Sequence, residues 1–419
     1  MRDLTTNLTD PLVYQNNPLI DACGPPLSTL NIAKRLVHLP PAPSAGLALP
    51  REAIDHHLAG LWRLHIPSDA GIGIARSIDV MMRQGYVHRN PQAPATWRRI
   101  YSQIGDEAAV SPVQLAATVT GLAGMGKTTA IERALQLYPQ VVCHDSFPGL
   151  MGPVKQLLWL KVDVPASGKI RDLVEAFAHA TDAALGTSMT EDLIGRRSVS
   201  GATLAHRWLQ RISCHFPGIF VLDEVQNLFK IERKSVREVT SRRPVSARPA
   251  LRIVDDESLK LVLTVTNWSK IPLMTSSTPD GLEAFNTRMS TSQRLLTAGL
   301  HMLPRPESPD DAFFGRHFVP ALCRYQWLPR KIPLSQELRA LLFELTAGIP
   351  RICVTLWIHA HQHAVRRGAD GLDFTDFTYA AANALAPLRA AVRALVSGDP
   401  QGMRRYEDAL GIGATRCGG

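Results

Sequence analysis

The sequence lacks the features that mark membrane-spanning, secreted and zinc-binding proteins. No stretch of about 18 to 20 residues is apolar enough to span a bilayer, and the uncharged run 108–126 is interrupted by Pro112 and several polar residues. The opening MRDLTTNLTD has no apolar segment of the secretory kind. The six cysteines contain no Cys-x-x-Cys pair, which argues against a zinc ribbon and a disulfide framework. We therefore expect a cytoplasmic protein with reduced, mostly buried cysteines and no membrane partner.

Length and composition indicate an ordered protein of more than one domain. The chain has 419 residues, of which 45% are hydrophobic and 20% charged, an ordinary globular composition. At roughly 150 residues per domain, this length predicts two to three domains. The net charge of +9 fits a polyanionic partner and equally fits a basic solvated surface, so charge alone does not decide between them.

Strand and helix signals divide the chain into four parts. Residues 1–104 contain a proline-rich stretch and one expected helix at 53–64. We interpret them as an N-terminal extension that contacts partners. Residues 105–305 alternate short apolar strands with helices, the pattern of a doubly wound parallel α/β sheet. Residues 306–395 predict a small helical lid domain, and residues 396–419 a C-terminal tail. The expected strands are 115–120, 157–164, 219–222, 271–274 and 300–303.

A phosphate-binding loop follows the first expected strand. Residues 121–128, Gly-Leu-Ala-Gly-Met-Gly-Lys-Thr, fit the pattern GxxxxGK[ST]. In this pattern Lys127 reaches the β and γ phosphates and the Thr128 hydroxyl ligates Mg²⁺. The helix expected at 128–137 directs its positive N-terminus at the same anion. The predicted nucleotide-binding residues of this loop are Gly121, Gly124, Met125, Gly126, Lys127, Thr128 and Thr129.

A second, acidic motif indicates hydrolysis. The apolar strand 219–222 leads into Asp223 and Glu224, which places both carboxylates at the edge of a parallel sheet where ligands bind. We expect Asp223 to hold Mg²⁺ and Glu224 to polarise the attacking water. Because this acidic pair favours ATP hydrolysis and no NKxD guanine signature occurs, we predict an ATPase with ATP and Mg²⁺ as cofactors.

Further polar residues are candidates for sensing the γ phosphate. The expected strand at 271–274 runs on into Ser277 and Thr278, either of which could contact the nucleotide or merely cap the next helix. Arg351 begins a helix of the second domain and could reach back to the nucleotide. Arg288 and Arg294 are candidates for an arginine that acts on a neighbouring subunit, of which we select Arg294.

With these motifs in place, the chain resembles an AAA+ ATPase and, more narrowly, the TnsC/TniB family of transposition regulators. The sensor element differs from the family pattern, in which Gly-Thr-Pro is usual where this chain has Ser277-Thr278-Pro279. The segments that carry the resemblance are 14–21 (YQNNPLID), 85–91 (GYVHRNP), 223–228 (DEVQNL), 346–351 (TAGIPR), 397–400 (SGDP) and 406–408 (YED).

The resemblance implies a function in bacterial DNA transposition. A member of this family binds ATP, forms a homo-oligomeric ring or filament on double-stranded DNA, and bridges a TniQ-type targeting protein to a DDE transposase. The resemblance assigns nucleotide and catalytic roles to Lys127, Thr128, Asp223 and Glu224, and sensor roles to Ser277 or Thr278 and to Arg351. It also implies a DNA-associated location in the cytoplasm.

Two basic segments are candidates for contact with DNA. Residues 230–252 look like an insertion and hold eight basic residues against two acidic ones, among them Arg242 and Arg243. They could lie along phosphates or form a solvated loop. Lys169 and Arg171 resemble the position at which family members meet the DNA backbone, and a solvated helix start is the alternative.

Two other functional classes stay open on sequence grounds. A helicase-loader-like or initiator AAA+ ATPase would share the same nucleotide motifs, and so would a signalling P-loop NTPase that acts only on proteins. A possible metal motif is set aside, because His359 and His363 lie on one helix face without an HExxH pattern or a carboxylate pair.

Overall fold

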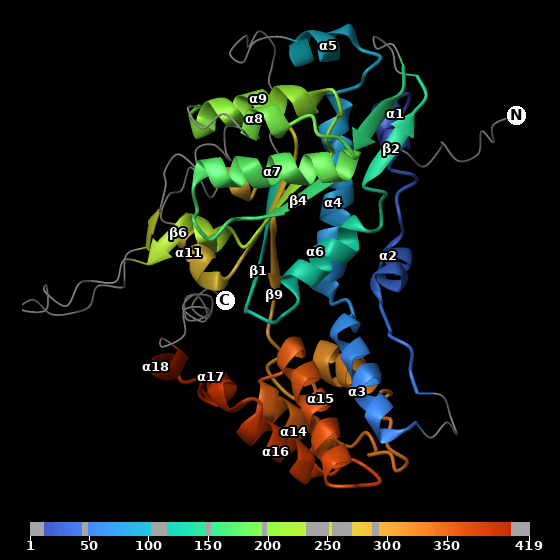
Figure 1. Cartoon of the computed structure of the whole chain (residues 1–419), viewed down its shortest axis with the longest axis vertical. Helices are drawn as coiled ribbons and strands as arrows, with labels where there is room; N and C mark the ends of the chain where they lie inside the picture. Colours follow the sequence, from blue (N-terminus) through green and yellow to red (C-terminus); the bar gives the residue numbers. More distant parts are fainter. Residues whose placement is uncertain are drawn as a thin grey trace, which may run out of the picture. The chain divides into compact units, whose positions relative to one another are not determined.

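A five-stranded sheet forms the centre of the α/β part of the chain (Figure 1). The structure, a computed structural model, describes residues 12–43, 49–101, 115–146, 152–194, 199–231, 251–253, 270–286 and 293–403. The strand order is β4-β5-β8-β1-β9, and the pairs β4·β5, β5·β8 and β1·β8 are parallel. The strands are β1 (Ala116–Gly121), β4 (Trp159–Asp163), β5 (Ile219–Asp223), β8 (Leu273–Ser277) and β9 (Leu300–Leu303).

Every residue of β1, β5 and β8 is buried, as expected for strands covered on both faces. The predicted parallel α/β sheet is therefore confirmed. Two expected strands need correction. The range 157–164 is divided between β4 and β3 (Val154–Leu157), because β3 pairs antiparallel with β2 (Val141–His144) before the chain enters the main sheet. The strand expected at 271–274 begins two residues later and continues into the hydroxyl residues.

The α/β part also contains the helices α4 (Asp69–Val87), α5 (Pro94–Tyr101), α6 (Lys127–Leu135), α7 (Ile170–Leu185), α8 (Glu191–Ile194), α9 (Gly201–Ser213) and α11 (Pro279–Asn286). Some of them pack on the sheet, whereas α5 and α8 lie against other helices (Figure 1). The 19-residue helix α4 was not expected, because Gly71, Gly73 and Gly85 weaken its helical signal. Gly85 has a packing reason, since an added Cβ would lie 2.7 Å from Pro272.

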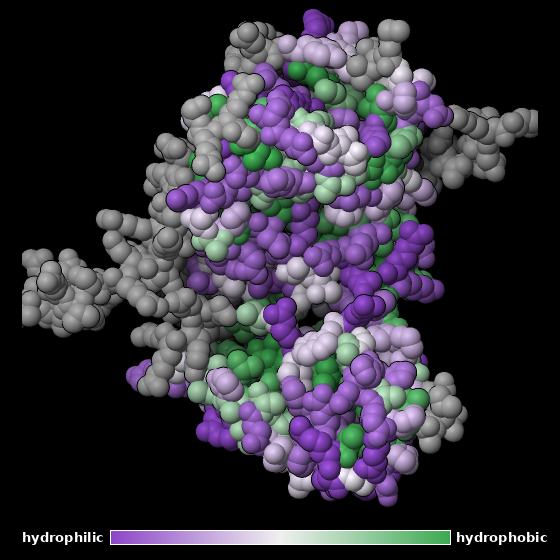
Figure 2. Space-filling model, in the orientation of Figure 1, coloured by the Kyte–Doolittle hydropathy of each residue, from purple (hydrophilic) through white to green (hydrophobic). Residues whose placement is uncertain are grey.

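An aromatic cluster joins α7 and α9 to the sheet. Phe177, Trp208 and Phe220 are buried with ring centroids 4.9 to 5.5 Å apart, the spacing of attractive aromatic contacts. Trp208 Nε1 donates a hydrogen bond to Thr181 Oγ1 at 3.1 Å, which satisfies its polar atom. On the face in Figure 2, the surface over these helices is mostly hydrophilic, with small apolar patches between polar residues.

The described chain divides into two units, each with its own hydrophobic core. Unit 1 comprises the described residues of Met1–Ser28, Gly73–Thr120 and Glu132–His301, and unit 2 those of Thr29–Ile72, Gly121–Ile131 and Met302–Gly419. The range 1–104, expected as one extension, is thus shared between the two units. The phosphate-binding loop belongs to unit 2, whereas Asp223 and Glu224 belong to unit 1.

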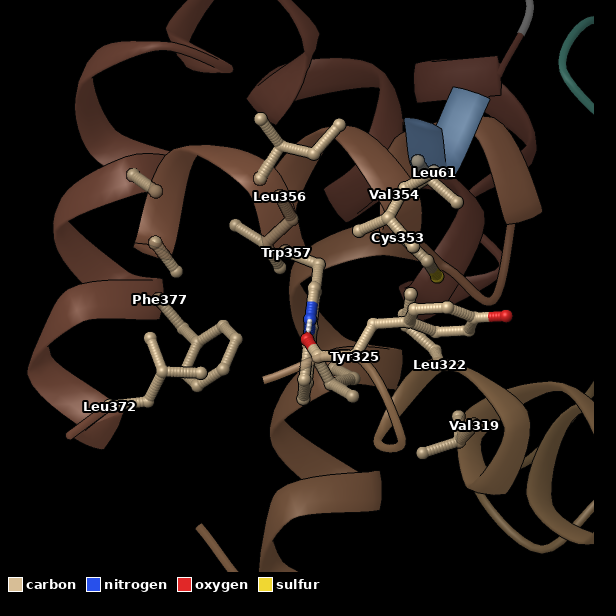
Figure 3. Close-up of a cluster of buried hydrophobic side chains, with 14 of the residues drawn as sticks. Leu61, Val319, Leu322, Tyr325, Cys353, Val354, Leu356, Trp357, Leu372 and Phe377 are labelled. Atoms are coloured by element: carbon tan, nitrogen blue, oxygen red, sulfur yellow. Dashed lines mark hydrogen bonds between the residues drawn. The ribbon is translucent and has the colours of Figure 1, made fainter. Parts of the chain in front are cut away.

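Unit 2 is built mainly from helices, as the sequence predicts for its C-terminal part. Tyr325 and Phe377 flank the buried ring of Trp357 (Figure 3). Trp357 Nε1 donates to the Tyr325 carbonyl at 2.8 Å. The Tyr325 hydroxyl donates to the Pro40 carbonyl at 2.8 Å, so the chain around Pro40 also belongs to unit 2. Its elements are α2 (Thr29–Leu36), α3 (Arg51–Ala59), η2 (Gly60–Arg63), η5 (Phe314–Phe318), α13 (Val319–Leu322), α14 (Gln336–Thr346), α15 (Pro350–Arg366), α16 (Phe374–Asn383), η6 (Ala386–Leu388), α17 (Arg389–Ser397) and α18 (Pro400–Met403).

Among the described residues, no single helix is long and apolar enough to cross a membrane. Only α14 and α15 taken together reach that length and composition, and they are bent by 112° relative to each other. Their apolar residues contribute to the core of unit 2.

Candidate nucleotide site

The phosphate-binding loop has the backbone conformation that its glycines allow. Gly124 and Gly126 have φ angles of +83° and +88°, a region that residues with a Cβ rarely adopt. The Met125 N–H donates to the Leu122 carbonyl at 3.2 Å, which closes the turn. Helix α6 starts at Lys127, so the loop ends at a helix N-terminus, where backbone N–H groups favour an anion.

Lys127 lies inside this loop. Its side chain is buried, and its ammonium donates to the carbonyls of Gly121 at 2.7 Å and Leu122 at 3.3 Å. These carbonyls hold the ammonium at the mouth of the loop. Thr128 and Thr129 follow in the first turn of α6 and are half-buried, so both hydroxyls belong to the same anion-binding end of the helix.

The structure brings Arg351 directly to the loop. The Arg351 N–H donates to the Gly124 carbonyl at 3.2 Å. A Cβ added at Gly124 would lie 2.9 Å from Ile349 Cγ2 and 3.3 Å from Arg351 Cβ. Gly124 is therefore required by this close approach as well as by its φ angle. The first turn of α15 and the phosphate-binding loop are in contact within unit 2.

A cavity of about 420 Å³ adjoins the loop within unit 2, a size typical of small-molecule sites. Gly124, Gly126, Thr129 and Arg351 line its phosphate side. The rest of the lining was not anticipated from sequence and combines apolar and acidic side chains. These residues include Trp62, Ile66, Asp69, Leu303, Asp311, Phe313 and Val354.

The unanticipated wall includes an exposed aromatic residue and a carboxylate. Trp62 is 54% exposed although it is a large aromatic residue, and it lines the cavity. Asp311 Oδ1 accepts hydrogen bonds from the N–H groups of Phe313 and Phe314, which fixes that carboxylate beside the cavity. No motif in residues 61–71 predicts that they line a cavity, because this position depends only on how the segment packs in unit 2.

Polar residues gather where four neighbouring strands of unit 1 end. The register pairs Thr120 with Ser277, Leu222 with Thr275 and Asp163 with Asp223. The carboxyl ends of these parallel strands therefore meet at one edge of the sheet, the edge at which ligands of open α/β sheets bind. Strand β1 continues from Thr120 directly into the phosphate-binding loop.

Asp223 and Glu224 differ in environment although they are adjacent. Asp223 is 1% exposed, and its Oδ1 accepts the Glu224 N–H at 3.0 Å. Glu224 is exposed and has a φ angle of +57°, an unusual conformation for a residue with a side chain. The Gln226 amide, from η3 (Val225–Leu228), donates to the Glu224 carboxylate. The buried acid suits a metal ligand, and the exposed acid can reach a water molecule.

In the described part of the chain, three buried hydroxyls at or beside this edge have no hydrogen-bond partner. They are Oγ1 of Thr120, Oγ of Ser276 and Oγ1 of Thr278, whereas the Ser277 hydroxyl donates to the Thr278 carbonyl at 2.9 Å. Unsatisfied buried polar atoms are costly, so a polar ligand would be stabilised here. Of the two sensor candidates, Thr278 is the one with a hydroxyl available for such a ligand. Within unit 1, the buried Asp223 carboxylate and these hydroxyls are groups that suit Mg²⁺ and a phosphate.

Lys161, which sequence analysis did not single out, is the basic neighbour of Asp223. Its ammonium lies 3.4 Å from Asp223 Oδ2, 2.8 Å from Asp163 Oδ1 and 3.1 Å from Glu132 Oε1. Burial lowers the pKa of Lys161, but hydrogen bonds and charges from the three carboxylates outweigh burial and raise the pKa above its ordinary value. The sequence signal that could have identified Lys161 is its position in an expected strand of otherwise mostly bulky apolar residues.

The candidate DNA-binding residues fall into different environments. Lys169 is exposed at the start of α7. Arg171 instead forms an ion pair with Glu175 at 2.8 Å and donates to the carbonyls of Ile194 and Val199. Its guanidinium is therefore engaged in contacts within unit 1. Arg242 and Arg243 lie outside the described residues.

Of the two arginines considered for action on a neighbouring subunit, Arg294 is exposed, and Arg288 lies outside the described residues.

The ends of the basic insertion form a short antiparallel pair. Strand β6 (Phe229–Ile231) pairs with β7 (Leu251–Ile253), and Lys230 faces Arg252 in the register. The backbone therefore leaves and re-enters the described part of unit 1 at adjacent points. Residues 232–250 lie outside the described residues.

The first two segments of the family resemblance pack against each other in unit 1. Asn17 is buried and its Nδ2 donates to the Tyr86 carbonyl at 2.8 Å. Asn90 Nδ2 donates to the Asn16 carbonyl at 3.0 Å. The Tyr86 hydroxyl donates to the Phe216 carbonyl at 2.9 Å, just before β5. Segments 14–21 and 85–91 thus contact each other, and Tyr86 binds the chain just before β5, the strand that ends in Asp223.

The histidine pair on α15 has a structural explanation other than metal binding. His363 Nδ1 and Asp376 Oδ1 are 2.7 Å apart, and Arg367 donates to both oxygens of the same buried carboxylate. Within the described ranges, no group of three or more His, Cys, Asp or Glu side chains is placed to hold a metal ion.

Comparison with known proteins identifies the class of the α/β region. Residues 113–269 match the family model of an AAA domain. A comparison with curated protein sequences gives no match. Two solved structures of the Aeropyrum pernix ORC2 protein are similar at 15% identity. Its ADPNP–ADP complexes give a TM-score of 0.39 with 74% of this chain and 67% of that chain covered, and its ADP form gives 0.40 with 77% and 79% covered.

The AAA-domain match, the parallel sheet, the phosphate-binding loop and the helical C-terminal region together confirm the expected α/β P-loop fold of the AAA+ class. The same match indicates that the chain is a nucleoside triphosphatase.

Proposed function

We propose that this protein is an ATP-binding and ATP-hydrolysing switch. The observation that carries the proposal is the contact between the phosphate-binding loop and the first turn of α15, beside a cavity of about 420 Å³. A nucleotide in that cavity contacts the loop through its phosphates and the α15 turn through Arg351. Binding therefore acts on the helical region, and hydrolysis releases it.

Each residue has a defined part in this switch. Lys127 exchanges the two carbonyls that hold it for the β and γ phosphates, and the N-terminus of α6 binds the same charge. Thr128 and Asp223 are the residues that would hold Mg²⁺, which when bound would supply positive charge to the phosphates. Glu224 accepts a proton from the attacking water, and Thr278 donates its hydroxyl to the γ phosphate. The proton and phosphate then leave with ADP.

Equilibrium binding and turnover test this proposal. Lys127→Ala should reduce ATP affinity at least tenfold, because the variant has no ammonium to bind the phosphates. Glu224→Gln should bind ATP normally and hydrolyse it at least a hundredfold more slowly, because the proton acceptor is removed. Calorimetric titration and phosphate release measure the two effects. Normal ATP affinity in Lys127→Ala, or rapid turnover in Glu224→Gln, would contradict the assigned roles.

We further propose that the switch acts in DNA transposition as a member of the TnsC/TniB type. Support comes from sequence segments in family order and from the direct packing of two of them, 14–21 against 85–91. In this role the protein assembles on double-stranded DNA in the ATP state and bridges a TniQ-type protein to a DDE transposase. Arg294, exposed on unit 1, then acts on the nucleotide of a neighbouring subunit.

Electron microscopy with double-stranded DNA tests this second proposal. Rings or filaments on DNA should form with a non-hydrolysable ATP analogue and be absent with ADP. Assembly on DNA without any response to a TniQ-type protein would favour an initiator-like or helicase-loader-like ATPase. Nucleotide binding without DNA-bound assembly would favour a switch that acts on proteins alone.

A further inference from the structure

We infer that Lys161 is a positioning residue that acts as an internal counter-ion for Asp223 and sets the Mg²⁺ concentration at which Asp223 binds the metal in the presence of nucleotide. This inference rests on the nucleotide-binding function proposed above. It concerns a residue outside the phosphate-binding loop and outside the acidic motif. Its basis is the arrangement of one ammonium among three carboxylates in unit 1.

The arrangement is asymmetric in distance and in burial. Asp223 is almost fully buried, whereas Asp163 and Glu132 have side chains that are 69% and 47% exposed. Lys161 is closest to the two exposed acids, at 2.8 and 3.1 Å, and farther from Asp223, at 3.4 Å. The three acids come from β4, α6 and β5, so the ammonium is held from three sides. Lys161 can stay bound to Asp163 and Glu132 when Asp223 turns to a metal ion.

Charge balance explains what the lysine does before nucleotide arrives. A buried carboxylate without a counter-charge is strongly unfavourable, and Lys161 supplies that charge within unit 1. The same positive charge opposes a divalent cation placed on Asp223. Lys161 therefore stabilises the ligand-free site and weakens its affinity for Mg²⁺. Asp223 therefore binds Mg²⁺ readily only when the nucleotide phosphates add enough negative charge to recruit the metal.

The two exposed acids should have the opposite effect to Lys161. If Glu132 or Asp163 is neutralised, the ammonium has fewer competing partners and pairs more strongly with Asp223. Such a variant should need more Mg²⁺ for nucleotide binding, whereas a variant without the ammonium should need less. A purely structural role of Lys161 in strand β4 would not produce effects of opposite sign.

The experiment titrates free Mg²⁺ against the affinity for a non-hydrolysable ATP analogue, measured by calorimetry. Lys161→Met should lower the half-saturating Mg²⁺ concentration by roughly five- to tenfold. Glu132→Gln and Asp163→Asn should raise it by roughly two- to threefold. Lys161→Arg keeps the charge and should restore a value within about twofold of the unaltered protein. An unchanged or raised Mg²⁺ requirement in Lys161→Met would overturn the inference.

A second measurement needs no nucleotide and separates this inference from the proposed function. Thermal unfolding compares Lys161→Met in the unaltered chain and in an Asp223→Asn background. Lys161→Met should lower the melting temperature in the first and have much less effect in the second, because the buried charge is gone. Equal losses in both would show that Lys161 does not compensate Asp223. If the protein does not bind ATP but Lys161→Met still costs less stability in the Asp223→Asn background, the proposed function is wrong. The charge compensation of Asp223 by Lys161 would then still hold.

Discussion

At the scale of single residues, the two glycines of the phosphate-binding loop make a matched pair. Both have positive φ, but a Cβ at Gly124 would lie 2.9 Å from Ile349 whereas a Cβ at Gly126 would meet nothing within 4 Å. Gly126→Ala should therefore cost about 1 kcal/mol of stability from backbone strain alone. Gly124→Ala should cost roughly a further 1 to 3 kcal/mol, because the α15 turn must move.

Chemical denaturation of the nucleotide-free protein measures this difference. Gly124→Ala should also bind ATP more weakly, since the displaced turn carries Arg351, which lines the cavity. Equal stability of the two variants would contradict the close approach between the loop and α15.

His361 provides a residue-scale prediction on pH. It is buried against Trp357 and Trp327, its Nδ1 faces the Trp357 carbonyl at 2.8 Å, and Lys331 and Asp376 are the charged groups that act on it. Burial lowers its pKa to about 4. Between that value and the unfolded value of about 6.5, the unfolded chain binds a proton that the native state does not. Stability therefore falls as the pH falls through this window, by on the order of 3 kcal/mol in total.

Urea unfolding at a series of pH values between about 7 and 5 measures this dependence. His361→Leu removes the titrating group and should show a flatter decline over the same range. The buried pair of Asp376 with Arg367 also loses stability in acid, because its carboxylate has a pKa below the usual value despite burial, held there by hydrogen bonds from Arg367 and His363. That loss falls at lower pH and should persist in His361→Leu. An identical slope above about pH 5 in the two proteins would contradict the prediction.

At the scale of elements, Asn17 links the start of the described chain to α4 and caps α1 (Pro18–Asp21). Its Oδ1 accepts the Leu19 N–H at 3.1 Å while its Nδ2 donates to the Tyr86 carbonyl. Asn17→Ala leaves both backbone groups unpaired and should destabilise unit 1 by about 2 to 3 kcal/mol. Gln15→Ala is the matched control, because this neighbouring side chain is exposed.

Denaturation monitored by circular dichroism compares the two variants. Gln15→Ala should stay within about 0.5 kcal/mol of the unaltered protein. A similarly small effect of Asn17→Ala would show that the two resemblance segments do not stabilise the fold and would return them to consideration as partner contacts.

At the scale of the whole molecule, the distribution of positive charge bears on the proposed DNA contact. The net charge is +9, and residues 230–252 hold eight basic against two acidic residues. If this segment lies on DNA, replacing Arg242 and Arg243 by Gln should reduce the slope of log affinity against log salt by about 0.9 for each phosphate that is no longer neutralised. Lys169→Gln should reduce the slope likewise. Arg171→Gln should instead lower stability, because its guanidinium is engaged within unit 1.

Fluorescence anisotropy with a labelled duplex at several salt concentrations measures these slopes in the presence of an ATP analogue. Unchanged slopes in the Arg242 and Arg243 variant would show that the basic insertion is a solvated loop. An unchanged slope in Lys169→Gln would remove the start of α7 from the DNA interface.

The sequence by itself determined the features that depend on neighbours in the chain. The glycine spacing of 121–126 requires positive φ at Gly124 and Gly126, and the apolar strand before Asp223 predicts a buried strand that ends in an acid. Both are local consequences of residue type, and both are present in the structure. The helical C-terminal region follows in the same way from apolar periodicity.

Only the tertiary structure decided which distant residues meet. Arg351 reaches the phosphate-binding loop, Asn17 binds the Tyr86 carbonyl, and Lys161 balances the charge of Asp223. The segment 346–351 predicted that Arg351 could reach the nucleotide. The contacts of Asn17 and Lys161 have no local signal, because they depend on how helices and strands are arranged around the sheet. The wall of the cavity formed by residues 61–71 was missed for the same reason. Residue types along the chain predict the secondary structure of a segment, whereas its tertiary contacts depend on how the segments pack.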